Sequence, residues 1–467
     1  MRQLPIVAPA PVVRAHAGAF RDLFANRCQF RHFQGYLTGL MVLDNKSLSG
    51  MARCLVDSAD TTNLSRFLSE APWDEAAVDD RRVEYLLAQT GHQRRAAADS
   101  VLALDDTLCE HVGGLFAHID RHYNHGDGRY PLAHNPVTSF YVSGPVRFPV
   151  DRRLYRRYEE LTQWATFAAT HCPERAIPTT AKERAKLRAA LEPILLGDPA
   201  FRAVHDQFRT KLTLGLDLVR AAIKRDLPFG VVLMDSWYLA EEVVTTLAEL
   251  KKDWVSLLKS NRNLETASFV LKDAAGQPVP LAGPHIQAQK LVPLLPRRAY
   301  RPVSVGDRTY WCFTLTVRVA SLGKVRLIIS FDNPDLTGNY ALLVTNRADW
   351  GAQKVIATYL LRWPVETFSQ DGKTLLGFDE YRMRSAEAVA KHWWLVCVAY
   401  SVLHLACLPA SLAEGVRPVK SIGAVCRDQA RALIEALILK AHALLAQGQQ
   451  ATTVFATLFA KLGWTPT

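Results

Sequence analysis

The stretch PFGVVLMDSWYLAEEVVTTLAELKKDWVSLLKS, residues 228–260, decides the fold. Residues 229–234 are almost entirely apolar and predict a buried strand, 237–250 predict a helix, and 254–258 predict a second strand. A strand, a helix and a strand in this order form the crossover unit of an α/β fold. Asp235 then lies at the carboxyl end of the first strand, where open α/β sheets carry their functional groups.

A second apolar strand, upstream of the first, also ends in acidic residues. Residues 101–104 read Val-Leu-Ala-Leu and are followed by Asp105 and Asp106, and residues 137–142 predict a further strand. Carboxylates at strand ends can converge on divalent cations, which prefer oxygen ligands. A turn or capping role is the simpler interpretation of any one such acid, and the pair weakens that interpretation without excluding it.

The region 266–345 has a different pattern, because apolar residues alternate with more polar ones. Within 309–319 the odd positions from Trp311 onward are apolar, which is the period of a half-buried strand. Residues 325–331 and 340–345 predict two more strands, separated by turn residues. We therefore expect a β-rich insertion within the α/β domain.

The rest of the chain is expected to be mainly helical. Residues 17–95 read as short helices with breaks near 47–50 and 60–63, arranged as a helix-turn-helix or, equally, as a plain helical bundle. Residues 151–225 are charged and helix-prone. The apolar stretch 392–413 contains two histidines, a serine and a proline, which favours a buried helix over a membrane span.

The composition suits a polyanionic partner. Of 467 residues 49% are hydrophobic, and Lys and Arg exceed Asp and Glu by 56 − 45 = 11. Each phosphate that a cation neutralises releases counterions, so a basic protein gains by binding nucleic acid, although a merely basic soluble protein has the same composition. The eight cysteines form no Cys-x-x-Cys pair, which argues against a zinc ribbon and fits a reducing cytoplasm.

The segment YLLRWPVETFSQDGK contains the most informative spacing. Tyr359, Arg362, Glu366 and Lys373 fall within an arc of about 60° if they share one helix. A carboxylate flanked by cations on one face suits a metal ligand beside phosphate-binding groups, and a solvated charged face is the alternative. Pro364 lies inside the segment, so the arrangement requires a kinked helix or a new helix that starts at Pro364.

Three further groups of residues are weaker candidates. His118 and His122 have metal-ligand spacing if they are helical, but no Cys or Glu completes a zinc site. Lys259 and Arg262 follow a strand end near Asp235 and are candidate phosphate contacts, with a solvated loop as the alternative. No phosphate-binding loop of the Gly-x4-Gly-Lys-Ser/Thr type is present, which argues against an ATP-driven mechanism.

The spacing Tyr359-x2-Arg362-x3-Glu366-x6-Lys373 resembles the signature of DDE-type insertion-sequence transposases. The motif LDDTLCEH resembles the first acidic motif of that family and favours Asp106, with Asp105 still open, and VVLMDSWY resembles the second and gives Asp235. The resemblance extends from about residue 29 to about residue 408.

The resemblance implies an RNase H-like catalytic core that depends on Mg²⁺ or Mn²⁺, acts on the double-stranded DNA of element ends and target, and works as a homodimer in a synaptic complex. Its implied metal ligands and catalytic residues are Asp106, Asp235 and Glu366. Arg362 and Lys373 would hold phosphate, with Tyr359 beside the cut strand. Related enzymes form hairpins and hold a flipped base, for which Trp311 or Trp237 would be the stacking partner, although core packing is the simpler role for each tryptophan.

The expected architecture is an α/β fold with an RNase H-like mixed-sheet core, a β-rich insertion and helical terminal regions. The expected parts are a helical DNA-binding region, the first part of the core, the insertion, the second part of the core and a helical C-terminal region, at residues 1–95, 96–265, 266–345, 346–385 and 386–467. We expect a cytoplasmic, nucleoid-associated protein. Two other functions stay open: a catalytically silent DNA-binding repressor or scaffold derived from a transposase, and a metal-dependent hydrolase of another substrate. Convergence of the three carboxylates would argue against the first of these.

Overall fold

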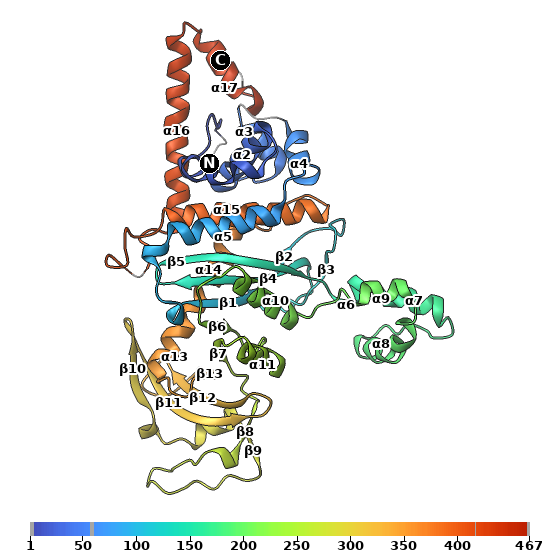
Figure 1. Ribbon diagram of the computed structural model, residues 1–467, viewed down its shortest axis with the longest axis vertical. Coiled ribbons are helices and arrows are strands. Elements are labelled where there is room, and N and C mark those ends of the chain that lie inside the picture. Colours follow the sequence, from blue (N-terminus) through green and yellow to red (C-terminus); the bar gives the residue numbers. More distant parts are fainter. Residues whose placement is uncertain (1–3, 57–59, 416, 465–467) are drawn as a thin grey trace.

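The computed structural model describes residues 4–56, 60–415 and 417–464. In this described part, thirteen strands form one mixed sheet, in the order β2-β4-β1-β6-β7-β13-β12-β11-β8-β9, with β3 and β5 also on β4 and β10 on β11. The sheet runs through the middle and lower parts of the molecule, and the N- and C-terminal helices lie above it (Figure 1).

Five of these strands form the centre of the sheet, namely β1 (Val101–Asp106), β4 (Leu132–Ser143), β5 (Val146–Tyr155), β6 (Val231–Met234) and β7 (Asp253–Leu257). β4 lies antiparallel to both β1 and β5, whereas β1, β6 and β7 are parallel. Helix α11 (Glu241–Glu249) connects β6 to β7, so the predicted strand-helix-strand unit is confirmed. Because β1 and β6 are parallel, Asp105, Asp106 and Asp235 lie at the same edge, which we call the acidic edge.

The β-rich region continues the central sheet. Its strands are β8 (Asn263–Glu265), β9 (His285–Gln287), β10 (Arg301–Val305), β11 (Arg308–Val319), β12 (Gly323–Phe331) and β13 (Tyr340–Thr345), with the short helix α12 (Ala288–Leu291) between β9 and β10. The three strands predicted in this region, 309–319, 325–331 and 340–345, are confirmed. β13 pairs antiparallel with β7, so the region shares the hydrogen-bonded sheet of the α/β centre.

Helices cover both faces of the central strands. On one face, α13 (Ala352–Tyr359), α14 (Trp363–Leu376) and α15 (Ala386–Leu405) pack on side chains such as Val101 and Ala103. On the other face, α10 (Lys211–Lys224) and α11 pack on Leu102 and Leu104. Alternate residues of β1 therefore belong to different cores, as expected for a strand buried on both faces.

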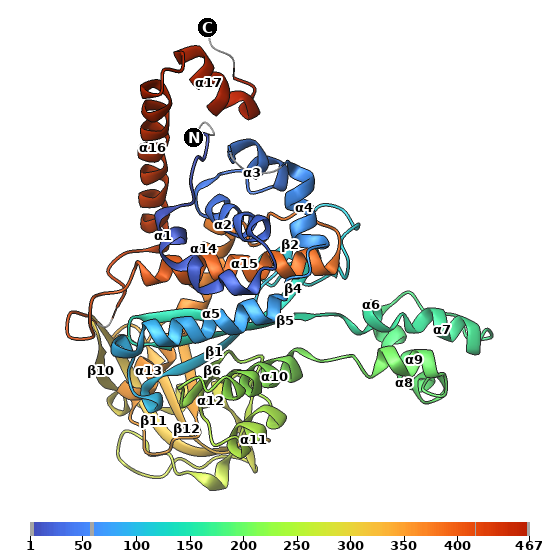
Figure 2. The ribbon, with the colours of Figure 1, turned by 45° about the horizontal axis from the view of Figure 1, so that its top comes forward.

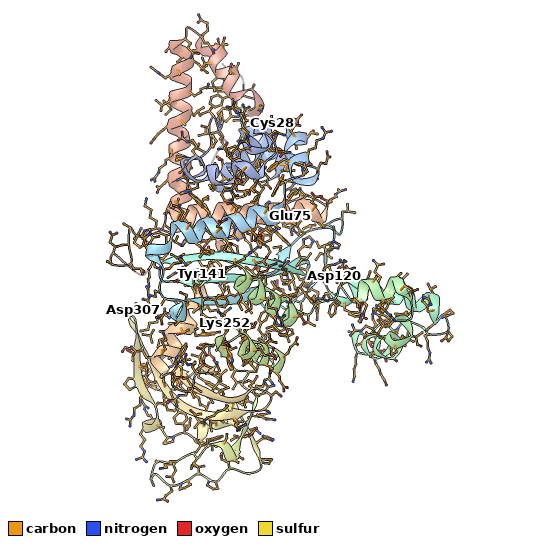
Figure 3. The ribbon with its side chains drawn as sticks, in the orientation of Figure 1. Cys28, Glu75, Asp120, Tyr141, Lys252 and Asp307 are labelled. Carbon is orange, nitrogen blue, oxygen red and sulfur yellow. The ribbon has the colours of Figure 1, made fainter. Side chains whose placement is uncertain are left out.

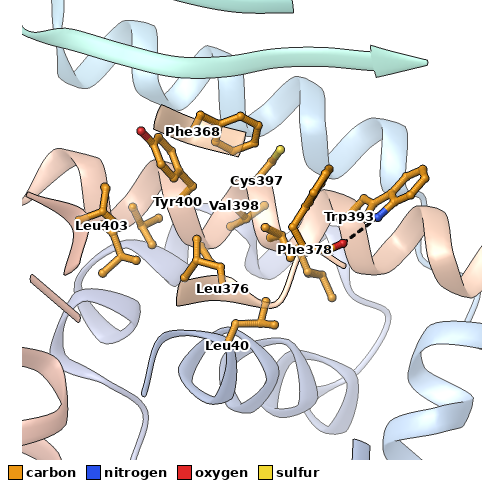
Figure 4. Close-up of a cluster of buried hydrophobic side chains, with 14 of the residues drawn as sticks. Leu40, Phe368, Leu376, Phe378, Trp393, Cys397, Val398, Tyr400 and Leu403 are labelled. Carbon is orange, nitrogen blue, oxygen red and sulfur yellow. Dashed lines mark hydrogen bonds between the residues drawn. The ribbon is translucent and has the colours of Figure 1, made fainter. Parts of the chain in front are cut away.

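Aromatic contacts fix the position of α14, which carries Glu366. Phe368 packs edge-on against Tyr400 of α15, with ring centroids 4.9 Å apart (Figure 4). At the end of α14, Trp393 Nε1 donates to the carbonyl of Phe378 at 3.1 Å (Figure 4). Among the described residues, α15 is the helix that is long and apolar enough to cross a membrane, and 83% of that apolar window is buried in the protein. Of the stretch 392–413 predicted as a buried helix, residues 392–405 are helical and lie in the core, whereas residues 406–413 form turns beyond the helix and include exposed positions.

The N-terminal helices are α1 (Pro11–His16), α2 (Arg27–Val42), α3 (Leu48–Cys54), α4 (Thr61–Ser69) and α5 (Glu75–Gln89). The two predicted breaks are helix starts, because the side chain of Ser47 accepts from the Gly50 amide and that of Asp60 accepts from the Asn63 amide. The link between α3 and α4 includes residues 57–59, which lie outside the described residues, so the helix-turn-helix stays a prediction. The C-terminal helices are α16 (Ile422–Ala446) and α17 (Ala451–Phe459).

The prediction that residues 151–225 are helical is wrong at its start, where β5 continues to Tyr155. Arg152 misled the interpretation because its charge is buried: it lies 4.3 Å from the Trp394 ring centroid and donates to the Cys397 thiol. Helices begin only after β5, with α6 (Tyr158–Thr162), α7 (Trp164–His171), α8 (Ala181–Leu195) and α9 (Pro199–His205).

Helices α6 to α9 form a separate helical module. Its own small core contains Trp164, Ala168, Cys172, Leu191, Leu195 and Phe201. The module projects sideways from the body (Figure 2), on tethers that leave the end of β5 and return at the start of α10. At the first tether, Arg157 pairs at 3.2 Å with Asp120, which Figure 3 labels; Asp120 begins β3 (Asp120–Arg121). The module is therefore attached at the acidic edge.

A buried histidine predicts acid sensitivity of the fold. His392 accepts from the Tyr36 hydroxyl at Nδ1 and donates from Nε2 to the Gly377 carbonyl, and burial lowers its pKa to about 4. The unfolded imidazole titrates near 6.5, so the unfolded state binds more protons than the folded state between pH 6.5 and 4. Lowering the pH across that window therefore reduces the unfolding free energy, and His392 accounts for roughly 3 kcal/mol of the loss.

We expect the His392→Gln variant to be less stable than the wild type at pH 7.5 and to show a smaller loss of unfolding free energy between pH 7 and 5. Urea unfolding at several pH values measures this. The variant His442→Gln, which changes an exposed histidine of α16, should keep the wild-type pH dependence. An unchanged pH slope in His392→Gln would contradict the assignment.

Candidate acidic site

Asp105 and Asp106 point to opposite faces of the sheet, as neighbouring strand residues do. Asp105 faces α14, where its Oδ2 lies 3.3 Å from the Arg362 guanidinium. Asp106 faces α10, where its Oδ2 accepts from Lys211 Nζ at 2.7 Å and its Oδ1 accepts from the Tyr238 hydroxyl at 3.2 Å. The two neighbouring acids therefore have different partners.

Asp235 follows β6 directly. Val231 and Leu233 belong to the core beneath α13 and α14, so the alternation of β6 directs Asp235 to the side of Asp105. Its Oδ1 accepts from the backbone amides of Trp237 at 2.9 Å and Tyr238 at 3.3 Å, which fixes the turn after the strand. This acid thus has the turn role that the sequence left open and also lies beside Asp105.

The signature segment is divided between three elements. α13 ends at Tyr359, residues Leu360–Arg362 form a 3₁₀ turn (η7), and α14 begins at Trp363 with Pro364 in its first turn. Of the two arrangements that Pro364 permits, the new helix is the one observed, with Glu366 in its first turn. Tyr359 and Arg362 reach the site from the preceding elements.

Arg362 connects two of the acids. Its guanidinium bonds to Glu366 Oε1 and lies against Asp105, and only 14% of its side chain is exposed. Burial raises the pKa of Asp105 to about 7; Arg362 opposes this shift, and the charges of Asp106 and Asp235 add to it. Several acids therefore share one buried cation at this edge.

The acid side chains suit a hard divalent cation, because Asp105, Asp235 and Glu366 offer only carboxylate oxygens. Across residues 4–56, 60–415 and 417–464, however, no group of three His, Cys, Asp or Glu side chains is already gathered closely enough to hold a metal ion. Asp106, which its motif position favoured, points toward α10 in this structure, while Arg362 lies between Asp105 and Glu366.

The other predicted residues divide into those at the acidic edge and those away from it. Lys373 Nζ donates to the Leu108 carbonyl at 2.7 Å, just beyond β1, and Lys259 lies 5.2 Å from the Trp237 ring centroid. Arg262 donates to the Leu239 carbonyl at 2.8 Å, close to the turn after β6. Trp311 is partly buried in the core on β11, four strands from β6, roughly 19 Å away.

Sequence reasoning missed two features of the site. The first is Trp363, between Arg362 and Pro364, which is 67% exposed. Trp237, which the sequence already offered as a stacking partner, is 53% exposed, so two aromatic faces are open to a ligand near the acids. A tryptophan directly before a helix-initiating proline was the available signal for Trp363. The second feature is the cluster around Asp106, where the Asn135 amide can donate to Asp106 at 3.0 Å and accept from Lys211 at 2.8 Å.

The histidines after Asp106 have structural partners. His118 has a left-handed backbone with φ 63°, and β3 begins at Asp120, so the helical spacing of His118 and His122 is not realised. His134 contacts the Tyr381 hydroxyl at 2.6 Å and donates to the Ala117 carbonyl at 2.8 Å. The structure gives a zinc site here no support within the residues it describes.

Residues 19–309 match the family described as DDE superfamily endonuclease. The chain belongs to this superfamily. The match includes β1 and β6 with their acids and ends before the segment that carries Glu366. Membership indicates a nuclease-type enzyme that acts on DNA, in a superfamily whose members generally depend on divalent metals. The comparison with curated proteins gives no match.

The arginine at the acidic edge gives a prediction for this DDE endonuclease. Replacing Arg362 by Met leaves Asp105 and Glu366 without their shared cation, so we expect the melting temperature to fall by a few degrees. Added Mn²⁺ should raise the melting temperature of Arg362→Met more than that of the wild type, because a divalent ion can then occupy the position of the guanidinium.

Arg347 provides a matched control, since it also lies between two carboxylates, 2.8 Å from both Asp253 and Asp349, at the opposite end of the strands. Arg347→Met should lose stability without gaining a response to Mn²⁺. Thermal scans with and without the ion measure both. Equal responses in the two variants would show that the acids near Arg362 do not form a cation site.

Proposed function

We propose that this DDE endonuclease is a DNA transposase of an insertion sequence, which cuts and joins element ends by two-metal-ion phosphoryl transfer. The observation that carries the proposal is the meeting of Asp105, Asp235 and Glu366 around Arg362 at one edge of the sheet. These residues come from three elements that are far apart in the chain, and the fold brings them together.

The strand order supports an RNase H-like core. Three antiparallel strands, β5, β4 and β1, are followed by the parallel strands β6 and β7, and the acids of β1 and β6 lie at their carboxyl ends. α14 crosses the same face and carries the third acid. The region from β8 to β13 is then a β-rich insertion between the second acid and the third.

We assign Asp105, Asp235 and Glu366 as the ligands for Mg²⁺ or Mn²⁺, because their side chains share a face. Asp106 stays the alternative that its motif position favours. When bound, the metal ions would activate the attacking oxygen and stabilise the leaving oxygen. Arg362 has to leave its position between the acids in the loaded enzyme, and a DNA phosphate at the acidic edge offers the guanidinium a bidentate partner.

The surrounding residues suit a DNA strand. Lys373, Lys259 and Arg262 place cations around the acidic edge, where they would contact phosphates. Trp363 and Trp237 present exposed rings on which an unpaired base could stack, and Trp311, partly buried on β11, stays a further candidate. Tyr359, partly buried beside Arg362, would orient that guanidinium toward the cut strand.

The proposed setting is a synaptic complex in which a homodimer holds two element ends in the cytoplasm at the nucleoid. One observation favours a second function. Because Arg362 neutralises two of the acids, a chain in which this contact is permanent would bind DNA without cutting it, as a repressor or scaffold. Metal-dependent cleavage distinguishes the two functions.

The first prediction concerns cleavage. Incubated with Mg²⁺ and a duplex that carries the flanking ends of its own element, the protein should nick the DNA or form hairpins. EDTA should abolish this activity, and Glu366→Gln should lower the rate roughly a thousandfold, since a lost ligand removes about 4 kcal/mol of transition-state stabilisation. Tight binding without cleavage under any metal would favour the repressor. Full activity of Glu366→Gln would show that the active site is assigned to the wrong residues.

The second prediction separates the neighbouring acids of β1. Asp105→Asn should lose cleavage as Glu366→Gln does, because it removes a ligand on the face of Arg362. Asp106→Asn should keep cleavage within about tenfold, and it should lower the unfolding free energy by about 1 kcal/mol because Lys211 loses its partner. The reverse pattern of activities would restore Asp106 as the ligand. Cleavage rates and urea unfolding of both variants show which of the two acids is the metal ligand.

A further inference from the structure

A cavity of about 420 Å³ lies at the other end of the strands whose carboxyl ends form the acidic edge. Val101 and Val231, the first residues of β1 and β6, line it, so it is separated from the acidic edge by the length of these strands. Its other walls are the β4–β5 turn at Gly144, the β10–β11 turn at Gly306, and α13 with η7. The cavity therefore belongs to a part of the fold that the proposed cleavage reaction does not use.

The cavity is strongly basic. The charged residues that line it are the cations Arg95, Arg147, Lys354 and Arg417 and the acid Asp99, which leaves an excess of 4 − 1 = 3 positive charges. The acid is already paired, because Lys354 Nζ lies 2.6 Å from Asp99 Oδ1. Within the described part of the chain, the other three cations have no carboxylate at ion-pair distance, so the cavity holds uncompensated positive charge.

Arg147 is the most constrained of these cations. Its backbone amide donates to His404 Nε2 at 2.8 Å, which fixes the start of its side chain. The Nε atom of the half-buried guanidinium is shielded from solvent and finds no acceptor among the described residues. Burial lowers the pKa of Arg147, and the nearby charge of Arg417 lowers it further. A charge kept under such conditions is expected to have an anionic partner when the site is in use.

Two glycine turns border the cavity. Gly144 and Gly306 have left-handed backbones, with φ of 61° and 62°. A Cβ atom on Gly144 would lie 3.1 Å from the side chain of Leu412, so the turn at this position has little room for a larger residue. The side chains that complete the lining include Trp350 and Leu361, which add apolar surface beside the cations. This combination of a charged centre and apolar walls is typical of small-ligand pockets.

We propose that this cavity is a phosphate-binding site, in which Arg147, Arg417 and Arg95 hold a phosphate group of a nucleotide or of a DNA backbone. One guanidinium can donate two parallel hydrogen bonds to two oxygens of a phosphate. Three arginines around one cavity therefore suit a bound phosphate better than a surface that only water contacts. The site is distinct from the acidic edge, since Val101 precedes Asp105 by four residues of an extended strand, about 13 Å.

The site also has a physical connection to the acidic edge. Thr358 and Leu361 line the cavity, and their neighbours Tyr359 and Arg362 lie against the acids. A ligand that fixes α13 and η7 from the cavity side therefore acts on the segment that positions Arg362. Binding itself needs neither metal nor cleavage, so the proposal can fail or succeed independently of the proposed transposase function.

The test is isothermal titration of the full-length protein with sodium pyrophosphate and, separately, with a 12-base-pair duplex of arbitrary sequence. We expect Arg417→Gln, which changes an exposed residue and so preserves the fold, to weaken binding of one of these probes about tenfold. Arg147→Gln should have the same effect. Arg175→Gln, which changes an exposed arginine of the helical module, should bind that probe as the wild type does.

The two probes distinguish the sources of phosphate. Pyrophosphate binding that depends on Arg417, with unchanged duplex binding, identifies a free nucleotide or similar small ligand. Duplex binding that depends on Arg417, without pyrophosphate binding, identifies a DNA backbone. If Arg417→Gln and Arg147→Gln bind both probes as tightly as the wild type, or if neither probe binds the wild type, the proposal is wrong.

Discussion

The parallel pairing of β1 with β6 is the constraint on which the rest of the structure depends. Val101 to Ala103 align with Val231 to Leu233, so two chain segments about 130 residues apart end at the same edge. Both strands are buried on both faces, and their apolar residues stabilise two cores at once. Acids at the ends of these strands lie together at the boundary of the hydrophobic interior. Partial burial there removes water from the carboxylates and disfavours their charged form. The site follows from strand pairing before any particular chemistry is considered.

A cluster of buried acids needs positive charge, and in this structure Arg362 supplies it. The guanidinium stabilises Asp105 and Glu366 against their mutual repulsion. In the proposed cleavage reaction the same contact would have a cost, because a bound metal ion and the guanidinium would compete for the same oxygens. Pro364 lies in the first turn of α14, so Arg362 belongs to the short 3₁₀ turn that precedes this helix, while Glu366 belongs to the helix itself.

Periodicity in the sequence was enough to predict seven of the strands and their order along the chain, since alternation and apolar runs are local properties. The strands 309–319 and 340–345 and the crossover around Asp235 were found in this way. Three features needed the folded chain. Burial of Arg152 turned a charged stretch into strand β5. The choice between Asp105 and Asp106 depends on which face of β1 is covered by α14, and the separation of Trp311 from the acids depends on strand order, which sequence alone does not give.

Asp106 shows how the two faces of β1 divide their tasks. Lys211, which pairs with it, begins α10 and also lies 5.4 Å from the ring centroid of Tyr155, the last residue of β5. Tyr155 and Lys211 are the points where the chain leaves for the helical module and returns from it. Lys211 contacts both Tyr155 and Asp106, so the two ends of the connection to the helical module meet at the acidic edge. Asp106 thus contacts the residue at which the chain returns from the module, whereas Asp105, its neighbour in β1, faces the side of Glu366.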